Sequence, residues 1–163
     1  MIKDVMGELE LSLNNEKTKV VDAKKEGFDF LGFTTKLVEN PKTCRYFPLI
    51  EPSKKSTKHI RAKIKALTTR RNLSLPKEVV INKLNEVVRG WTNYFYYQNC
   101  SEEFSSLKNY FEERVRIYLR RKHANKHIGY KAYPYEYLYK IMGLYRIPTT
   151  APWKQTAKAY ERR

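Results

Sequence analysis

Residues 84–95 read LNEVVRGWTNYF, and this stretch decides how the chain around it folds. Apolar side chains recur every three or four residues through it and just before it, at Val80, Leu84, Val87, Val88, Trp91 and Phe95. That spacing places them on one face of a helix, which we expect to run from about Pro76 to Asn99. Gly90 inside this helix costs about 1 kcal/mol relative to alanine, so we expect it to permit a bend or a close helix approach near Trp91.

Two further helices are expected, one before this segment and one after it. The first opens near Pro52, with Ser53 or Ser56 as its N-cap, and ends before a break at residues 72–75. The other runs from about Glu102 to Lys122, and its acidic start and basic end suit the helix dipole. Their apolar faces contain Ile60, Ile64 and Leu67, and Phe104, Leu107, Phe111, Val115, Tyr118 and Leu119. Three amphipathic helices joined by short loops predict a small bundle.

Residues 1–52 predict a small β-ribbon. Two β-prone runs, Thr18–Ala23 and Phe28–Leu37, flank a turn-like segment at residues 24–27, and Tyr46–Ile50 is a candidate third strand. A ribbon of two or three strands is marginally stable alone. We therefore expect it to pack on the helices or on another subunit.

Residues 129–163 form a tyrosine-rich, basic extension. We expect a short helix from about Pro134 to Met142 with Gly143 as its stop, and a frayed end from Thr149 onward. The predicted fold class is mainly α: a three-helix bundle preceded by a small antiparallel β-ribbon and followed by a short helix and a tail. Its expected divisions are residues 1–52, 53–128 and 129–163.

The charge is strongly basic and unevenly distributed. The 163 residues carry a formal net charge of +16. Residues 1–52 hold 8 basic and 9 acidic side chains, whereas residues 53–163 hold 25 basic and 8 acidic ones. Two runs contain no acid, Lys54–Arg71 and Arg114–Lys131. A one-signed field of this size favours a polyanionic partner, with affinity that falls as salt is added.

Two motifs resemble a known protein family. The stretch LNEVVRGWTNYF resembles the signature of the maturase-specific (thumb, X) domain of group II intron-encoded proteins. Residues 9–19, LELSLNNEKTK, followed by GFDFLGF at 27–33, resemble the last conserved block of the reverse-transcriptase palm in the same family. The resemblance covers about residues 8–127. It implies a thumb-like helical domain that grips intron RNA and stabilises its self-splicing fold.

Catalytic chemistry is not expected of this chain. A polymerase needs clustered carboxylates that hold two divalent metals. The chain has three aspartates, Asp4, Asp22 and Asp29, none beside another acid, and the aromatic-Ala-Asp-Asp turn of a reverse transcriptase is missing. Asp29 is expected to be structural. His123 and His127 share a helical spacing, but their cationic neighbours would repel a metal ion, so we expect no metal and no cofactor.

We therefore expect an RNA-binding, maturase-type domain that binds group II intron RNA and assists splicing, with no enzymatic activity. Two alternatives remain open: the thumb subunit of a split reverse transcriptase, with a separately encoded palm as partner, and a general nucleic-acid-binding bundle. The candidate RNA-binding residues are Lys54, Lys55, Lys58, Arg61, Lys65, Arg70, Arg71, Arg89, Asn93, Tyr94, Arg114, Arg116, Arg120, Arg121 and Lys122. The candidate structural motif residues are Gly90, Trp91, Phe95, Phe30, Leu31, Gly32 and Phe33.

The compartment is expected to be reducing. Cys44 and Cys100 are too few and too far apart for a disulfide framework. No apolar run approaches the roughly 18 residues of a membrane-spanning helix, and no signal-peptide core is present. We expect a cytoplasmic (bacterial) or organellar protein that does not use a membrane as partner.

Overall fold

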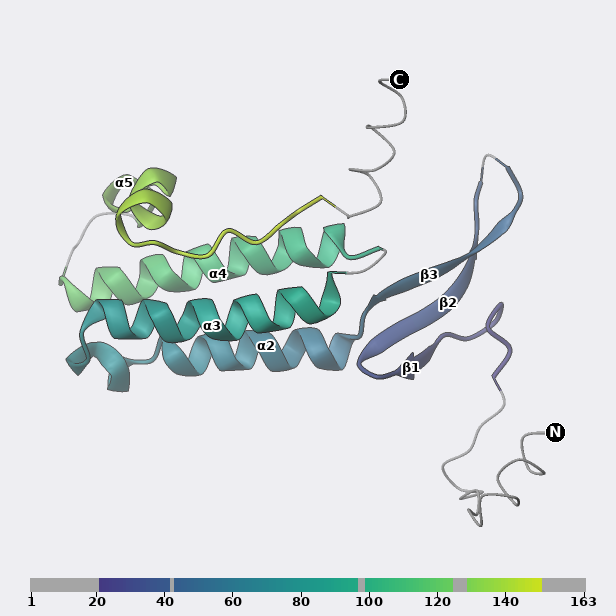
Figure 1. The fold of residues 1–163 in the computed structure, drawn as a ribbon, viewed down its shortest axis with the longest axis horizontal. Helices are drawn as coiled ribbons and strands as arrows, with labels where there is room; N and C mark the ends of the chain where they lie inside the picture. Colours follow the sequence, from purple (N-terminus) through teal and green to yellow (C-terminus); the bar gives the residue numbers. More distant parts are fainter. Residues whose placement is uncertain (1–20, 42, 97–98, 125–128, 151–163) are drawn as a thin grey trace, which may run out of the picture.

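The computed structural model describes residues 21–41, 43–96, 99–124 and 129–150. Three long helices lie side by side, and a small sheet sits at one end of them (Figure 1). Of the described residues 58% are helical, with a three-stranded antiparallel sheet before the long helices and short helical turns after them. The predicted fold class is confirmed.

The sheet consists of β1 (Phe28–Phe30), β2 (Phe33–Glu39) and β3 (Tyr46–Pro52) in the order β1-β2-β3. Phe30 pairs with Phe33, so only Leu31 and Gly32 form the turn between β1 and β2. Both turn residues have positive φ, 48° and 83°, as a tight two-residue hairpin requires.

One prediction for the ribbon is therefore wrong, because the run at residues 28–37 is two strands and not one. β-Propensity continues through the turn, and only the lone glycine signalled the break. Residues 21–23 are not a strand, and residues 18–20 of that predicted run lie outside the described residues. The predicted third strand is confirmed and extends to Pro52.

Three helices form the bundle, and the cap of the first was correctly predicted. In α2 (Lys54–Leu67) the Ser53 hydroxyl accepts a hydrogen bond from the Ser56 backbone N–H at 3.2 Å. A 3-10 helix, η1 (Arg70–Ser74), connects α2 to α3 (Lys77–Phe95), which ends four residues before the predicted Asn99. The third long helix is α4 (Ser101–Lys122).

The core lies between these helices and includes the predicted apolar faces. Its buried members include Ile60, Ile64, Val80, Leu84, Val88, Phe95, Phe104, Leu107, Phe111, Val115, Tyr118 and Leu119. Gly90 is not part of a close helix contact: it is exposed, and a Cβ built on it meets nothing within 4 Å. The prediction of a close approach at Gly90 is therefore wrong.

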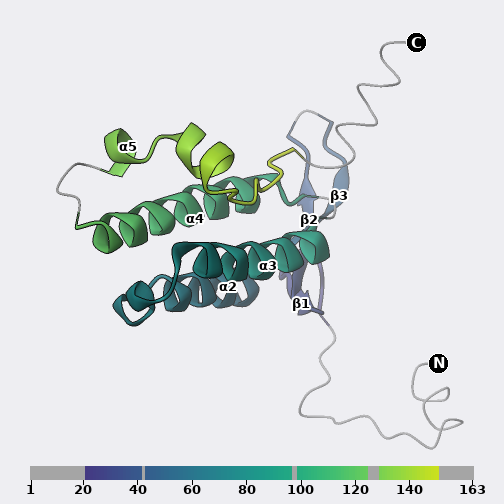
Figure 2. The ribbon, with the colours of Figure 1, turned by 60° about the vertical axis from the view of Figure 1, so that its left-hand side comes forward.

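The extension packs against α4 on the side away from α2 (Figures 1 and 2). It contains the short α5 (Gly129–Ala132), which was not predicted, and η2 (Tyr137–Ile141), a π-helical turn within the predicted helix. Gly143 follows with φ +62°. The buried side chains Tyr133, Leu138, Leu144 and Ile147 join the core of the bundle. The extension up to residue 150 is thus anchored to the helices.

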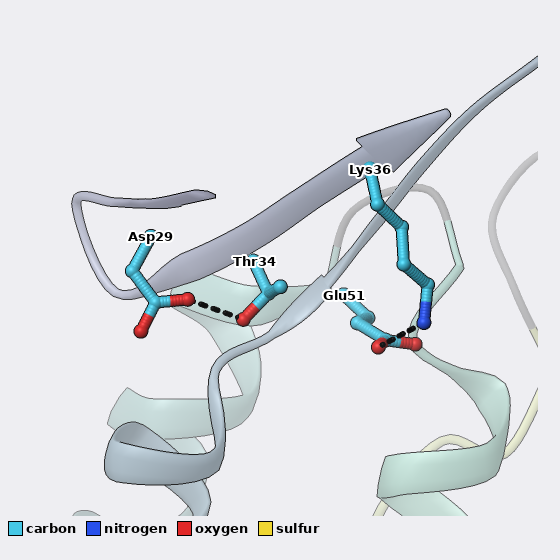
Figure 3. Close-up of polar contacts among 4 residues, drawn as sticks. All are labelled: Asp29, Thr34, Lys36 and Glu51. Carbon is cyan, nitrogen blue, oxygen red and sulfur yellow. Dashed lines mark hydrogen bonds and ion pairs between the residues drawn. The ribbon is translucent and has the colours of Figure 1, made fainter. Parts of the chain in front are cut away.

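The ribbon leans on the helical part, which was one of its two predicted supports. The Phe33 ring lies 4.8 Å from the Phe95 ring, and the Gly32 carbonyl accepts hydrogen bonds from the Ser53 N–H and the Ser56 hydroxyl. Within the ribbon, the Thr34 hydroxyl donates to the Asp29 carboxylate at 2.6 Å, and Lys36 pairs with Glu51 (Figure 3). Asp29 therefore has the structural role predicted for it.

Candidate nucleic-acid interface

The outer face of α2 is a surface of lysines. Thr57, Ile60 and Ile64 are buried on one side of α2, and the opposite side of the helix is exposed to solvent. The helix contains no acid, and five of its exposed residues are lysines: Lys54, Lys55, Lys58, Lys63 and Lys65. In the described part of the chain the ion pairs within 4.0 Å are Lys36–Glu51, Arg116–Glu112 and Lys140–Glu136. The α2 lysines are not neutralised by any of these carboxylates.

A second group of cations gathers at one end of the bundle. α2 and α4 run in the same direction, since Arg61 contacts Ser106, Thr68 contacts Arg114, and Asn72 contacts Tyr118. The last turn of α4 therefore lies beside η1, at the same end of the bundle (Figure 1). Four exposed arginines lie in these two segments: Arg70, Arg71, Arg120 and Arg121. Arg120 also lines a hollow with Arg116 and Tyr130, on the side of the extension. We call the four exposed arginines and the five lysines of α2 the cationic face.

Three predicted contact residues are used partly to hold this face in place. Arg61 donates to the Ser106 hydroxyl at 2.7 Å and lies over the Tyr110 ring. Arg114 donates to the Thr68 hydroxyl at 2.8 Å, and Lys122 donates to the Leu73 and Leu75 carbonyls at 2.8 and 2.6 Å. Their charges add to the field, but these N–H groups are occupied within the protein.

Arg116 is a scaffold residue and does not belong to the surface. Its side chain is only 3% exposed, its Nε donates to the Tyr133 carbonyl at 3.0 Å, and its Nη1 lies 3.6 Å from the Glu112 carboxylate. The guanidinium also lies over the rings of Tyr130 and Tyr135, 4.2 and 4.9 Å from their centroids. Arg116 therefore fastens the extension to α4, in contrast to its predicted role as an RNA contact.

Glu112 has a second partner on the extension. The Tyr139 hydroxyl donates a hydrogen bond to the buried Glu112 carboxylate. Burial raises the pKa of Tyr139 well above its ordinary value, and the hydrogen bond to Glu112 raises it further. The phenol therefore stays protonated and keeps donating across the whole physiological range.

The remaining predicted contacts on α3 face different neighbours. Arg89 is exposed and lies over the Tyr145 ring at 5.3 Å, on the side of the extension. Asn93 is exposed, and Tyr94 is 54% exposed although its hydroxyl donates to the Leu31 carbonyl at 2.9 Å. The structure thus does not join Arg89 to the cationic face.

The motif residues divide between core and surface. Phe95 is buried, and Trp91 and Phe33 pack against the core from its edge. Phe30 and Leu31 are 65% and 68% exposed on β1 and its turn. Gly32 is the turn glycine, and a Cβ there would come within 2.9 Å of the Ser56 hydroxyl.

Sequence reasoning omitted one exposed lysine and the aromatic partners of the arginines. Lys63 belongs to the same acid-free run as its neighbours and was detectable from that run alone. Tyr110, Tyr130, Tyr135 and Tyr145 each lie under a guanidinium. Their distant positions in the chain gave no signal of these contacts.

The residues that the structure describes contain neither a cluster of metal-ligating side chains nor a membrane-spanning helix. No group of three or more His, Cys, Asp or Glu side chains there could hold a metal ion. His123 lies near the Tyr133 ring, while His127 falls outside those residues. None of the described helices combines the length and apolarity needed to cross a membrane.

The bundle and its cationic face define a small, basic helical domain. Residues 57–134 match the family model described as Group II intron, maturase-specific domain. The matched part runs from the first turn of α2 to just beyond α5, so the helical bundle is similar to the maturase-specific domain of group II intron proteins. The match does not extend over the β-ribbon, so the palm resemblance of residues 9–33 stays a prediction. No curated protein matches the chain.

Proposed function

We propose that this protein binds group II intron RNA and stabilises the folded form of the RNA that splices. The observation that carries the proposal is the cationic face. Nine exposed Lys and Arg side chains lie along α2 and at the adjoining bundle end, and no carboxylate in the described part of the chain pairs with them. A maturase-specific domain supplies the class of partner, an intron RNA.

The mechanism is charge neutralisation. A folded RNA brings phosphates close together, and each Lys or Arg placed against a phosphate releases condensed counterions. Arginine also fits a phosphate with two parallel hydrogen bonds, which the four arginines at the bundle end can provide. The RNA itself supplies the splicing chemistry, and this chain acts as a binding domain with no catalytic step of its own.

Rigidity of the cationic face supports the same proposal. The Arg114 and Lys122 side chains tie α4 to the end of α2 and to η1 through hydroxyl and carbonyl acceptors. The exposed arginines of the two segments are therefore held at a fixed spacing. A preorganised face loses less conformational freedom on binding and favours one arrangement of phosphates.

Competition binding tests the proposal against the general nucleic-acid binder. The labelled ligand is a group II intron transcript, and the competitors are a scrambled transcript of equal length and duplex DNA, all at one salt concentration. We expect the unlabelled intron to compete best. Equal competition by duplex DNA would assign the cationic face to general polyanion binding and refute a maturase role.

One observation favours a second candidate, the thumb subunit of a split reverse transcriptase. Phe28, Phe30 and Leu31 are exposed on β1 and its turn, at the edge of the sheet. Exposed apolar side chains on a sheet edge are suited to a partner strand. Co-expression with a palm of the same family decides this: primer extension that needs both chains supports the split enzyme, and no gain from this chain refutes it.

A further inference from the structure

Two adjoining hollows follow the edge of α2 that faces α3. The first, about 340 Å³, lies between α2 and α3 and is lined by Lys63, Gly90, Trp91 and Tyr94 among others. The second, about 600 Å³, lies between the N-terminal turn of α2 and the β1–β2 turn. His59 lines both hollows, so together they form one groove.

The two sides of this groove differ in chemistry. Lys55, His59 and Lys63 are exposed and lie four residues apart, which places them along one edge of α2 at steps of about 6 Å. Trp91 and Tyr94 line the opposite side. In the first hollow His59 and Lys63 thus face a pair of aromatic rings, and the basic row continues into the second hollow at Lys55, where Asp29 is also part of the lining.

Both aromatic side chains are held rigidly. Trp91 packs on Phe95 and Phe104, with ring centroids 4.6 and 5.6 Å apart. Tyr94 stacks on Phe33 at 5.7 Å and 29°, and its hydroxyl is fixed on a carbonyl of the β1–β2 turn. About half of the Tyr94 side chain nevertheless remains exposed. The Trp91 indole N–H has no acceptor in the described part of the chain.

Gly90 keeps the groove open. Glycine destabilises the interior of a helix, and the usual structural reasons for a glycine there are a tight contact or a positive φ. Neither applies, because a Cβ would meet nothing within 4 Å and the positive-φ glycines in the described residues are Gly32 and Gly143. Because Gly90 has no side chain, the space beside Trp91 stays open.

We propose that this groove binds an unstacked nucleobase of a single-stranded RNA segment. The base lies against Trp91 and Tyr94, and the flanking phosphates follow Lys55, His59 and Lys63. An aromatic platform beside a basic track is how proteins bind single strands, and the track continues the charge of the cationic face. The inference rests on the proposed function and adds a base-binding subsite to it.

The test compares a short single-stranded oligoribonucleotide with the same oligonucleotide made abasic, using the full chain. Gly90→Leu adds a side chain to the lining of the first hollow, at a position where a Cβ meets no atom within 4 Å. We expect it to weaken binding of the base-bearing probe by about 5- to 150-fold, the range for loss of one stacked base, and to leave the abasic probe unaffected. Asn82→Leu, which places the same side chain at an exposed α3 position outside both hollows, is the matched control and should bind both probes normally.

A fluorescence measurement keeps the test independent of how Gly90→Leu folds. Trp91 and Trp153 are the two tryptophans of the chain, so Trp153→Phe leaves Trp91 as the sole reporter. The base-bearing probe should quench it, and the abasic probe should not. The proposal would be overturned if the two probes quenched Trp91 fluorescence equally, or if an aromatic peptide quenched it and the RNA did not.

Different results would refute the subsite and the proposed function. If the intron transcript binds through the cationic face but the base-bearing and abasic probes bind the groove equally, only the subsite is refuted. If neither the transcript nor the probes bind, the proposed function fails with it.

Discussion

Two arginines one helical turn apart on α4 should give opposite phenotypes. Arg116 is 3% exposed and its ion-pair partner Glu112 is 1% exposed, whereas Arg120 is exposed. Arg116→Ala leaves a buried carboxylate with Tyr139 as its remaining hydrogen-bond partner. Removing one member of a buried pair costs about 3–5 kcal/mol, and the cation–π contacts with the tyrosines of the extension are lost as well.

Arg120→Ala removes no contact of this kind, and an exposed substitution usually changes stability by less than about 0.5 kcal/mol. Urea unfolding followed by circular dichroism measures both variants, and binding to the intron transcript is measured on the same samples at a temperature where both are folded. We expect Arg116→Ala to lose stability and Arg120→Ala to lose affinity.

The double variant Glu112→Gln/Arg116→Met is the control for the buried charge. It replaces both charges but keeps an acceptor for the Tyr139 hydroxyl, so it should be more stable than Arg116→Ala. An Arg116→Ala variant within about 1 kcal/mol of the parent would contradict the view that this arginine fastens the extension.

Three further predictions concern single residues. Gly90→Ala should raise the free energy of unfolding by up to about 1 kcal/mol, because a Cβ meets no neighbour there; a loss in denaturant unfolding would contradict the open groove. Ser53→Ala should lower it by about 1 kcal/mol by removing the N-cap bond to Ser56, whereas Ser53→Asn should retain most of it in the same assay. Because the pKa of Tyr139 is higher folded than unfolded, its contribution is complete below pH ~10 and is lost as the pH rises above that value; Tyr139→Phe should reduce this alkaline loss in a pH series of unfolding curves.

The helices and the cap could be predicted because they depend on local spacing. The apolar stripes of α2, α3 and α4 and the Ser53 cap are all set by residues within one or two turns. The maturase signature also lies within a single helix. For this reason short stretches of sequence indicated both the fold class and the resemblance that the family model matches over residues 57–134.

The roles of the basic residues could not be predicted in the same way, because burial depends on distant segments. α4 is covered on one side by α2 and α3 and on another by the extension, so its charged positions are not all solvent-facing. Glu112 and Arg116, four residues apart, carried a weak local sign of pairing. The carbonyls that hold Lys122 belong to residues nearly fifty positions earlier, and nothing in the sequence indicated them.

The hairpin was missed for a related reason. Phe28 to Leu37 is β-prone throughout, and a leucine at positive φ is not expected in a turn. The turn is held instead by contacts from elsewhere: the Leu31 carbonyl accepts from Tyr94, and the Gly32 carbonyl accepts from Ser53 and Ser56. Tertiary hydrogen bonds overrode the local preference.

The salt dependence of binding to the intron transcript tests the cationic face most directly. Lys58→Ala/Lys65→Ala removes two exposed charges from α2, and Lys25→Ala/Lys83→Ala removes two exposed charges elsewhere as the matched control. If both α2 lysines contact phosphates, the slope of log affinity against log salt should flatten by about 1.4 to 1.8, at 0.7 to 0.9 per contact, while the control keeps the parent slope. An unchanged slope in the α2 variant, or equal flattening in both, would contradict the claim that this face binds the RNA.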